Sequence, residues 1–105
     1  MPERSLIVRQ RARDEVLAIA DRIALDNPKA AQRFKAAFER DCGLLLEFPQ
    51  VGRRCKHAGR ELRGLRSRPL TGFVSWLVFY RVTTTAVDVG RVLHGARDLR
   101  RALRF

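Results

Sequence analysis

The chain has 105 residues, of which 46% are hydrophobic and 31% are charged, and its formal net charge is +11. This length suits one domain covering residues 1–105, and the hydrophobic content excludes a disordered basic tail. No stretch approaches the roughly 20 apolar residues of a membrane span, and the first residues lack a signal-peptide pattern. We therefore expect a cytoplasmic protein that does not bind a membrane.

The positive charge is concentrated in the second half of the chain. Residues 1–50 contain nine lysines and arginines against eight acidic residues, whereas residues 51–105 contain thirteen against three. Twelve of those thirteen are arginines, whose planar guanidinium groups suit carboxylates and phosphates. This distribution favours an acidic partner over a charge that only confers solubility, with direct nucleic-acid binding as a secondary expectation.

The first half of the chain predicts one strand followed by two helices. Residues 6–8 are apolar and indicate a short strand, and from residue 12 the apolar residues recur with the period of a helix that ends near residues 25–26. Asn27 is a good N-cap and Pro28 suits the first position of a second helix, which ends at Phe48 and Pro49. Helices joined by so short a link should form an antiparallel hairpin.

The second half predicts three strands. Residues 50–60 indicate a basic loop, residues 61–68 an arginine-rich strand that ends at Pro69, and residues 73–82 a strand that is apolar on both faces. A turn at residues 83–85 leads to a last strand over residues 86–93, and residues 98–103 suggest a short terminal helix. The predicted fold is α+β with the order β-α-α-β-β-β, a helical hairpin packed on a small, mostly antiparallel sheet.

Several side chains have simple structural interpretations. In the strand over residues 73–82, alternation places Trp76 and Tyr80 on the same side as Val78, which favours the core for both. Cys42 lies at an apolar position of the second helix. Two cysteines and two histidines at irregular spacing fall short of a zinc-site pattern, so we expect neither a metal nor another cofactor.

From about residue 5 to residue 99 the chain resembles the RelE/ParE superfamily of bacterial toxins, and several stretches look specifically ParE-like. The resemblance is carried by the order and spacing of short motifs, namely residues 12–19, 26–31, 45–52 and 61–63, Val78-Phe-Tyr-Arg-Val82, and Arg91-Val-Leu-His-Gly-Ala-Arg-Asp98. It implies a toxin of a type II toxin–antitoxin pair that binds and poisons DNA gyrase. It also implies a ParD-like antitoxin whose acidic C-terminal segment folds across the toxin.

The resemblance assigns expected roles to the basic residues. Target binding would involve the segment at the end of the last strand, which contains His94, Arg97, Asp98, Arg100 and Arg101. Antitoxin binding would involve the arginine-rich strand and the tryptophan of the next one, that is Arg63, Arg66, Arg68 and Trp76.

Two alternatives remain open at the level of sequence. A RelE-like, ribosome-dependent mRNA endonuclease would use Arg68, Arg81, His94 and Arg97 as its catalytic set. His94 could transfer protons, but arginine is a poor general base, and the terminal tyrosine or lysine-rich set common among nuclease members is missing. The chain is therefore not expected to be an enzyme. A non-toxic basic module that binds an acidic partner is the other alternative.

Overall fold

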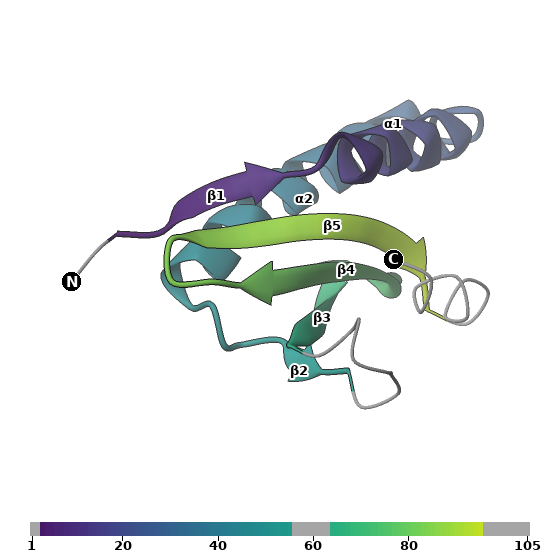
Figure 1. The fold of residues 1–105 in the computed structure, drawn as a ribbon. Coiled ribbons are helices and arrows are strands. Elements are labelled where there is room, and N and C mark those ends of the chain that lie inside the picture. The colour runs from purple at the N-terminus through teal and green to yellow at the C-terminus, as the bar shows by residue number, and fades with distance from the viewer. Residues whose placement is uncertain (1–2, 56–63, 96–105) are drawn as a thin grey trace.

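The computed structural model describes residues 3–55 and 64–95, which form two helices on one side of a five-stranded sheet (Figure 1). The elements in chain order are β1 (Ser5–Val8), α1 (Gln10–Ala24), α2 (Pro28–Glu47), β2 (Arg53–Arg54), β3 (Leu65–Leu70), β4 (Phe73–Val82) and β5 (Ala86–His94). Across the sheet the order is β1-β5-β4-β3-β2, with β1 parallel to β5 and every other pair antiparallel. The predicted fold class is confirmed.

The two helices form where the apolar period predicts them. In α2, the Asn27 side chain accepts a hydrogen bond from the backbone N–H of Ala30 at 3.1 Å, and Pro28 occupies the first turn. The apolar stripe of α1 contributes buried Val16 and Ala20, and that of α2 contributes a longer buried row: Ala31, Phe34, Ala37, Phe38, Cys42 and Leu45. Neither of these helices is long and apolar enough to cross a membrane.

The main core lies between the helices and the side of the sheet that they cover, which we call the helix face. Alternate residues of β4, Val78 and Tyr80, point into this core together with Val87, Val89 and Val92 of β5. Tyr80 and Phe34 are completely buried there. The prediction that Tyr80 belongs to the core is confirmed.

The opposite side of the sheet, which we call the open face, carries a second and smaller apolar cluster. Leu65, Phe79 and Leu93 are buried in this cluster, and Leu77 and Cys55 pack against it. β4 therefore contributes apolar side chains to both faces, as the continuous apolar sequence predicted.

Two local predictions are wrong. Pro69 does not end β3, which continues to Leu70. On its outer side β3 pairs with β2 only at Arg66 and Ser67. Pro69 therefore lies beyond the end of β2, where proline's missing N–H is tolerated. The expected loop over residues 50–60 contains β2, which is too short to produce an alternating pattern. The predicted strand residues 61–63 and the terminal helix at 98–103 lie outside the described residues.

Candidate functional site

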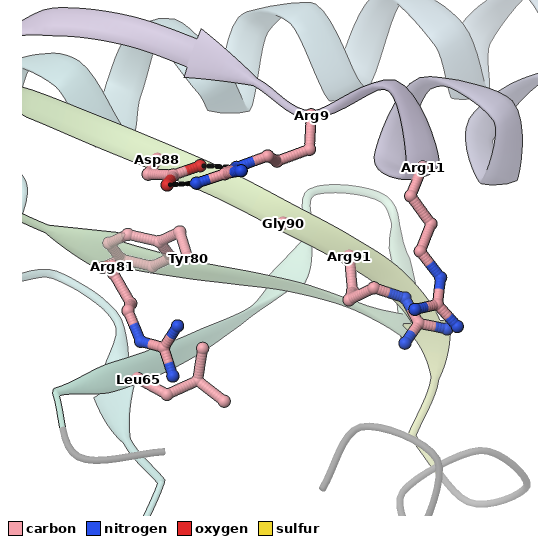
Figure 2. Close-up of a pocket in the computed structure, with 8 residues that line it drawn as sticks. All are labelled: Arg9, Arg11, Leu65, Tyr80, Arg81, Asp88, Gly90 and Arg91. Atoms are coloured by element: carbon pink, nitrogen blue, oxygen red, sulfur yellow. Dashed lines mark hydrogen bonds and ion pairs between the residues drawn. The ribbon is translucent and has the colours of Figure 1, made fainter. Parts of the chain in front are cut away.

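The candidate site is a half-open pocket of about 330 Å³ where the β1–α1 junction meets β3, β4 and β5 (Figure 2). Its lining residues, which we call the arginine pocket, are Arg9, Arg11, Leu65, Tyr80, Arg81, Asp88, Gly90 and Arg91. Four of these are arginines and one is an aspartate, so the described lining has a formal charge of +3. Such a lining attracts anions.

Arg9 enters the pocket because β1 ends next to β5. The ladder between β1 and β5 continues by one hydrogen bond, from the N–H of Arg9 to the carbonyl of Val89 at 2.9 Å. The Arg9 guanidinium then donates to both carboxylate oxygens of Asp88, at 2.9 and 2.6 Å (Figure 2). This bidentate pair raises the pKa of Arg9 through the hydrogen bond and the charge of Asp88, and it anchors one rim of the pocket.

Arg91 is held at the sheet edge that β1 leaves uncovered. Its guanidinium donates to the Glu15 carboxylate of α1, with the shortest contact at 2.8 Å, and the N–H of Val92 donates to the same carboxylate at 2.9 Å. Because β1 pairs with β5 only as far as Val89, Glu15 occupies the place of a further strand residue. This contact links α1 to β5 and fixes Arg91, which is 4% exposed.

An irregularity in β5 shapes the centre of the pocket. Phe79 pairs with Arg91 and Tyr80 pairs with Val89, so Gly90 is an extra residue in β5, as in a β-bulge. Beyond the bulge, Arg81 lies opposite both Asp88 and Leu65 on the open face. Figure 2 shows Arg81 extending from β4 beside Leu65 on one side of the pocket, and Arg11 descending from α1 beside Arg91 on the other.

Arg68, a candidate for both catalysis and antitoxin binding, belongs to a separate cluster on the helix face. The buried Asp41 carboxylate of α2 accepts hydrogen bonds from the Arg68 guanidinium at 3.0 Å, the Thr71 N–H at 2.8 Å and the Thr71 hydroxyl at 2.8 Å. We call these three residues the Asp41 network. It fastens the β3–β4 hairpin to α2, so Arg68 has a structural role.

Arg66 and Tyr80 hold the segment that follows α2. The Tyr80 hydroxyl donates to the Pro49 carbonyl at 2.9 Å and accepts from the Gly52 N–H at 2.7 Å, while Arg66 donates to the Gly52 carbonyl at 2.8 Å. A Cβ at Gly52 would clash with the Tyr80 ring and hydroxyl. Burial raises the pKa of Tyr80, so the phenol stays protonated and in place.

His94 and Trp76 lie together at the far end of the sheet from the β4–β5 turn. They are register partners, and their rings meet edge to face with centroids 5.2 Å apart. Trp76 also meets Phe34 edge to face at 6.2 Å, which makes it part of the core while leaving it partly exposed. His94 is therefore positioned by aromatic packing at the point where the described chain approaches its C-terminal segment.

Of the four residues expected of a nuclease, the three that the structure describes lie apart from one another. Arg68 contacts Asp41 on the helix face and His94 packs on Trp76, whereas Arg81 lies in the arginine pocket on the open face. The remaining site residues that were expected from sequence lie outside the described residues, namely Arg63, Arg97, Asp98, Arg100 and Arg101.

Sequence reasoning missed Arg9, Arg11 and Arg91 as site residues. Arg9 and Arg11 belong to the nearly neutral half of the chain, so the charge count drew attention away from them. The available signal was a helix start with arginines and no acidic residue in its first turn, which opposes the usual preference at a helix N-terminus.

The two cysteines, Cys42 and Cys55, both lie within the described residues. Both are free; burial raises the pKa of Cys42 to about 12, with a further contribution from Asp41, and burial also raises the pKa of Cys55. Within residues 3–55 and 64–95, no three His, Cys, Asp or Glu side chains gather as metal ligands would.

Comparison with known proteins agrees with the observed fold. The family model of the ParE toxin of the parDE type II toxin–antitoxin system matches residues 6–99. A structure of the chromosomal ParDE system from P. aeruginosa matches 88% of this chain and 96% of its own, with TM-score 0.73 and 18% identity. The E. coli DinJ–YafQ toxin–antitoxin complex matches 90% and 94%, with TM-score 0.59 and 13% identity. No curated protein matches the sequence.

Proposed function

The chain belongs to the ParE toxin family of type II toxin–antitoxin systems, and from this premise we propose that it arrests growth by binding DNA gyrase and trapping gyrase on cleaved DNA. The observation that carries the proposal is the family match, which extends through the motif from Arg91 to Asp98. In this role the protein performs no bond chemistry of its own and acts as a docking surface for its target.

The proposed gyrase-binding residues are His94, Arg97, Asp98, Arg100 and Arg101. The packing of His94 against Trp76 supports this assignment, because it fixes the first residue of the segment on a rigid strand end. A fixed start reduces the conformational entropy that a charged docking segment loses on binding.

The proposed neutralising partner is a ParD-like antitoxin with an acidic segment. The net charge of +11 supports an acidic partner. We propose Arg63, Arg66, Arg68 and Trp76 as its contacts. Arg66 and Arg68 already bind Gly52 and Asp41, but both remain partly exposed. Their guanidinium groups can therefore donate further hydrogen bonds to acidic groups of the antitoxin.

The placement of proton-transfer groups supports target poisoning over RNA cleavage. An endonuclease needs a base, an acid and cations around one phosphate. Among residues 3–55 and 64–95, His94 packs on Trp76 at one end of β4, whereas Arg81 lies near the other end of the same strand. The Tyr80 hydroxyl is bound to Pro49 and Gly52 within the core. Their geometry assembles no acid–base pair around the arginine pocket.

The test combines a gyrase assay with a matched pair of variants. Purified toxin should inhibit supercoiling and increase the fraction of linear plasmid. Arg97→Ala should weaken both effects at least tenfold, and His94→Ala should weaken them less. Arg33→Ala removes the same charge from the exposed surface of α2 and should leave both effects within twofold of the parent protein.

Three results would contradict the proposal or part of it. Folded toxin in excess that leaves gyrase unaffected removes gyrase as the target. New RNA 5′ ends after toxin expression, with gyrase unaffected, replace poisoning with the endonuclease function. If Arg97→Ala and Arg33→Ala weaken gyrase inhibition to the same extent, the proposed contact segment is wrong. The effect on gyrase would then depend on the overall positive charge of the toxin.

A further inference from the structure

The segment between α2 and β2 presents two large apolar side chains at the surface, close to the end of the sheet where β1 begins (Figure 1). Phe48 is 54% exposed and Val51 is 49% exposed. Among residues 3–55 and 64–95, Phe48 is the one exposed aromatic residue. The two side chains belong to an open hollow of about 460 Å³, lined by Arg4, Glu47, Phe48, Pro49, Gln50 and Val51. Apolar residues gathered in this way indicate an interaction surface more clearly than single exposed ones do.

Hydrogen bonds from distant strands hold residues 48–51, which we call the 48–51 turn, in one conformation. The Tyr80 hydroxyl donates to the Pro49 carbonyl at 2.9 Å. Arg66 of β3 donates to the carbonyl of Gln50 at 3.2 Å and to that of Gly52 at 2.8 Å. The backbone that carries the two apolar side chains is therefore fixed before any partner arrives. A preformed surface of this kind loses little conformational entropy on binding.

Two arginines flank the apolar pair. Arg4 lines the hollow, and Arg66 contacts the turn from β3. Arg4 donates to the Thr83 carbonyl at 2.8 Å, and the hydrogen bonds of Arg66 also go to backbone carbonyls. Within the described residues, neither guanidinium is paired with a carboxylate. Glu47 is the only acidic residue in the described lining, so the surroundings of the apolar pair favour an acidic partner.

This combination of groups fits a peptide segment better than other occupants. Aromatic residues and arginine are enriched at the centres of protein–protein interfaces. A second copy of the chain would bring its own charge of +11 and the same arginines against this surface. Single-stranded nucleic acid stacks on successive aromatic residues, whereas the neighbours of Phe48 in the hollow include aliphatic Pro49 and Val51. An acidic segment with an apolar anchor residue supplies both kinds of contact.

We propose that the 48–51 turn is a docking site for the acidic segment of the antitoxin. An apolar side chain of that segment packs against Phe48 and Val51, and carboxylates next to it bind Arg4 and Arg66. The inference rests on the proposed function for the identity of the partner. It adds an apolar anchor site to the contacts proposed above, which it joins through Arg66, and it does not depend on gyrase being the target.

The test is binding of the purified full-length chain to the ParD-like protein expressed from the reading frame immediately upstream of its gene, measured by surface plasmon resonance. Phe48→Ala should weaken binding about tenfold, mainly through faster dissociation, because the anchor contact is lost. Phe48→Leu keeps an apolar side chain and should stay within about threefold of the parent. Arg4→Gln should weaken binding about threefold at low salt, and high salt should remove this difference because the lost contact is ionic.

Leu17→Ala is the matched control for Phe48→Ala. Leu17 is 52% exposed, close to the 54% of Phe48, but it belongs to α1 and does not line the hollow. Its affinity for the upstream protein should stay within about twofold of the parent. Both positions are exposed, so the thermal midpoints of both variants should stay near that of the parent. An unchanged midpoint separates lost binding from lost folding.

Other occupants of the turn give different results, each of which overturns the inference. Equal losses for Phe48→Ala and Leu17→Ala assign the effect to exposed apolar surface in general. A dimeric parent chain that becomes monomeric as Phe48→Ala assigns the turn to self-association. If Phe48→Ala loses affinity for a labelled uridine oligonucleotide but not for the upstream protein, the turn takes nucleic acid.

The same assay separates failure of this inference from failure of the proposed function. Full binding by Phe48→Ala removes the docking site but leaves the antitoxin as the partner. A folded parent chain that does not bind the upstream protein removes both the partner and the docking site. Neither result affects the gyrase assay, because gyrase takes no part in this measurement.

Discussion

The Asp41 network and the arginine pocket both pair arginine with carboxylates, but at different depths in the molecule. In the network, one buried carboxylate accepts three hydrogen bonds and satisfies Arg68 and Thr71. In the pocket, two separate carboxylates are used: Asp88 binds Arg9, and Glu15 binds Arg91. The Arg9 side chain is 63% exposed, whereas the Asp41 side chain is 4% exposed, so one pair lies at the surface and the other in the interior. The number of basic residues alone does not reveal this difference.

The largest expected effect comes from disrupting the Asp41 network. Asp41→Ala removes the acceptor of three hydrogen bonds and leaves the Arg68 charge beside buried groups, so the free energy of unfolding should fall by about 3 kcal/mol. Urea denaturation measures this loss. Asp21→Ala, at an exposed position of α1, should change stability by less than about 0.5 kcal/mol. Similar values for the two variants would show that the network contributes little.

A smaller loss is expected from a substitution of Tyr80. It lines the arginine pocket, but its hydroxyl is bound to Pro49 and Gly52. Tyr80→Phe should reduce the free energy of unfolding by about 1–3 kcal/mol, because the buried Gly52 N–H loses its acceptor. Urea denaturation measures the difference. Unchanged stability would show that the Tyr80 hydroxyl contributes little to holding Pro49 and Gly52.

The smallest effect concerns pH and the interior next to Asp41. The folded chain raises the pKa of Cys42 from 9.0 to about 12, so above pH 9 the unfolded chain releases the thiol proton first and stability falls as the pH rises. Comparing urea denaturation at pH 7 and pH 10 should show a smaller loss for Cys42→Ala than for the parent chain. Cys55→Ala, at a less buried position, should retain most of the loss. An identical loss in the Cys42 variant would contradict this assignment.

Much of the fold follows from local sequence signals. Asn27 and Pro28 mark the start of α2, and the apolar rows of both helices are the rows that are buried. The alternation in β4 correctly places Tyr80 and Trp76 toward the helices. These predictions succeed because capping, helical period and strand alternation depend on residues close together in the chain.

The composition of the site was less predictable. Arg66 and Arg68 look like surface charges in the sequence, yet both hold backbone or side-chain groups of distant segments. Pro69 looks like the end of a strand, but β2 stops short of it and β3 continues. In each case the deciding neighbour comes from another part of the chain, which no local pattern specifies.

The sequence by itself determined the two amphipathic helices, the doubly apolar strand β4, the excess of arginine and the resemblance to the ParE family. Only the tertiary structure decided which carboxylate binds each arginine and which arginines line one pocket. The physical reason is the separation of the partners: Arg9 meets Asp88 across 79 residues, and Glu15 meets Arg91 across 76. The register between β1 and β5 brings Arg9 to Asp88, and the placement of α1 brings Glu15 to Arg91.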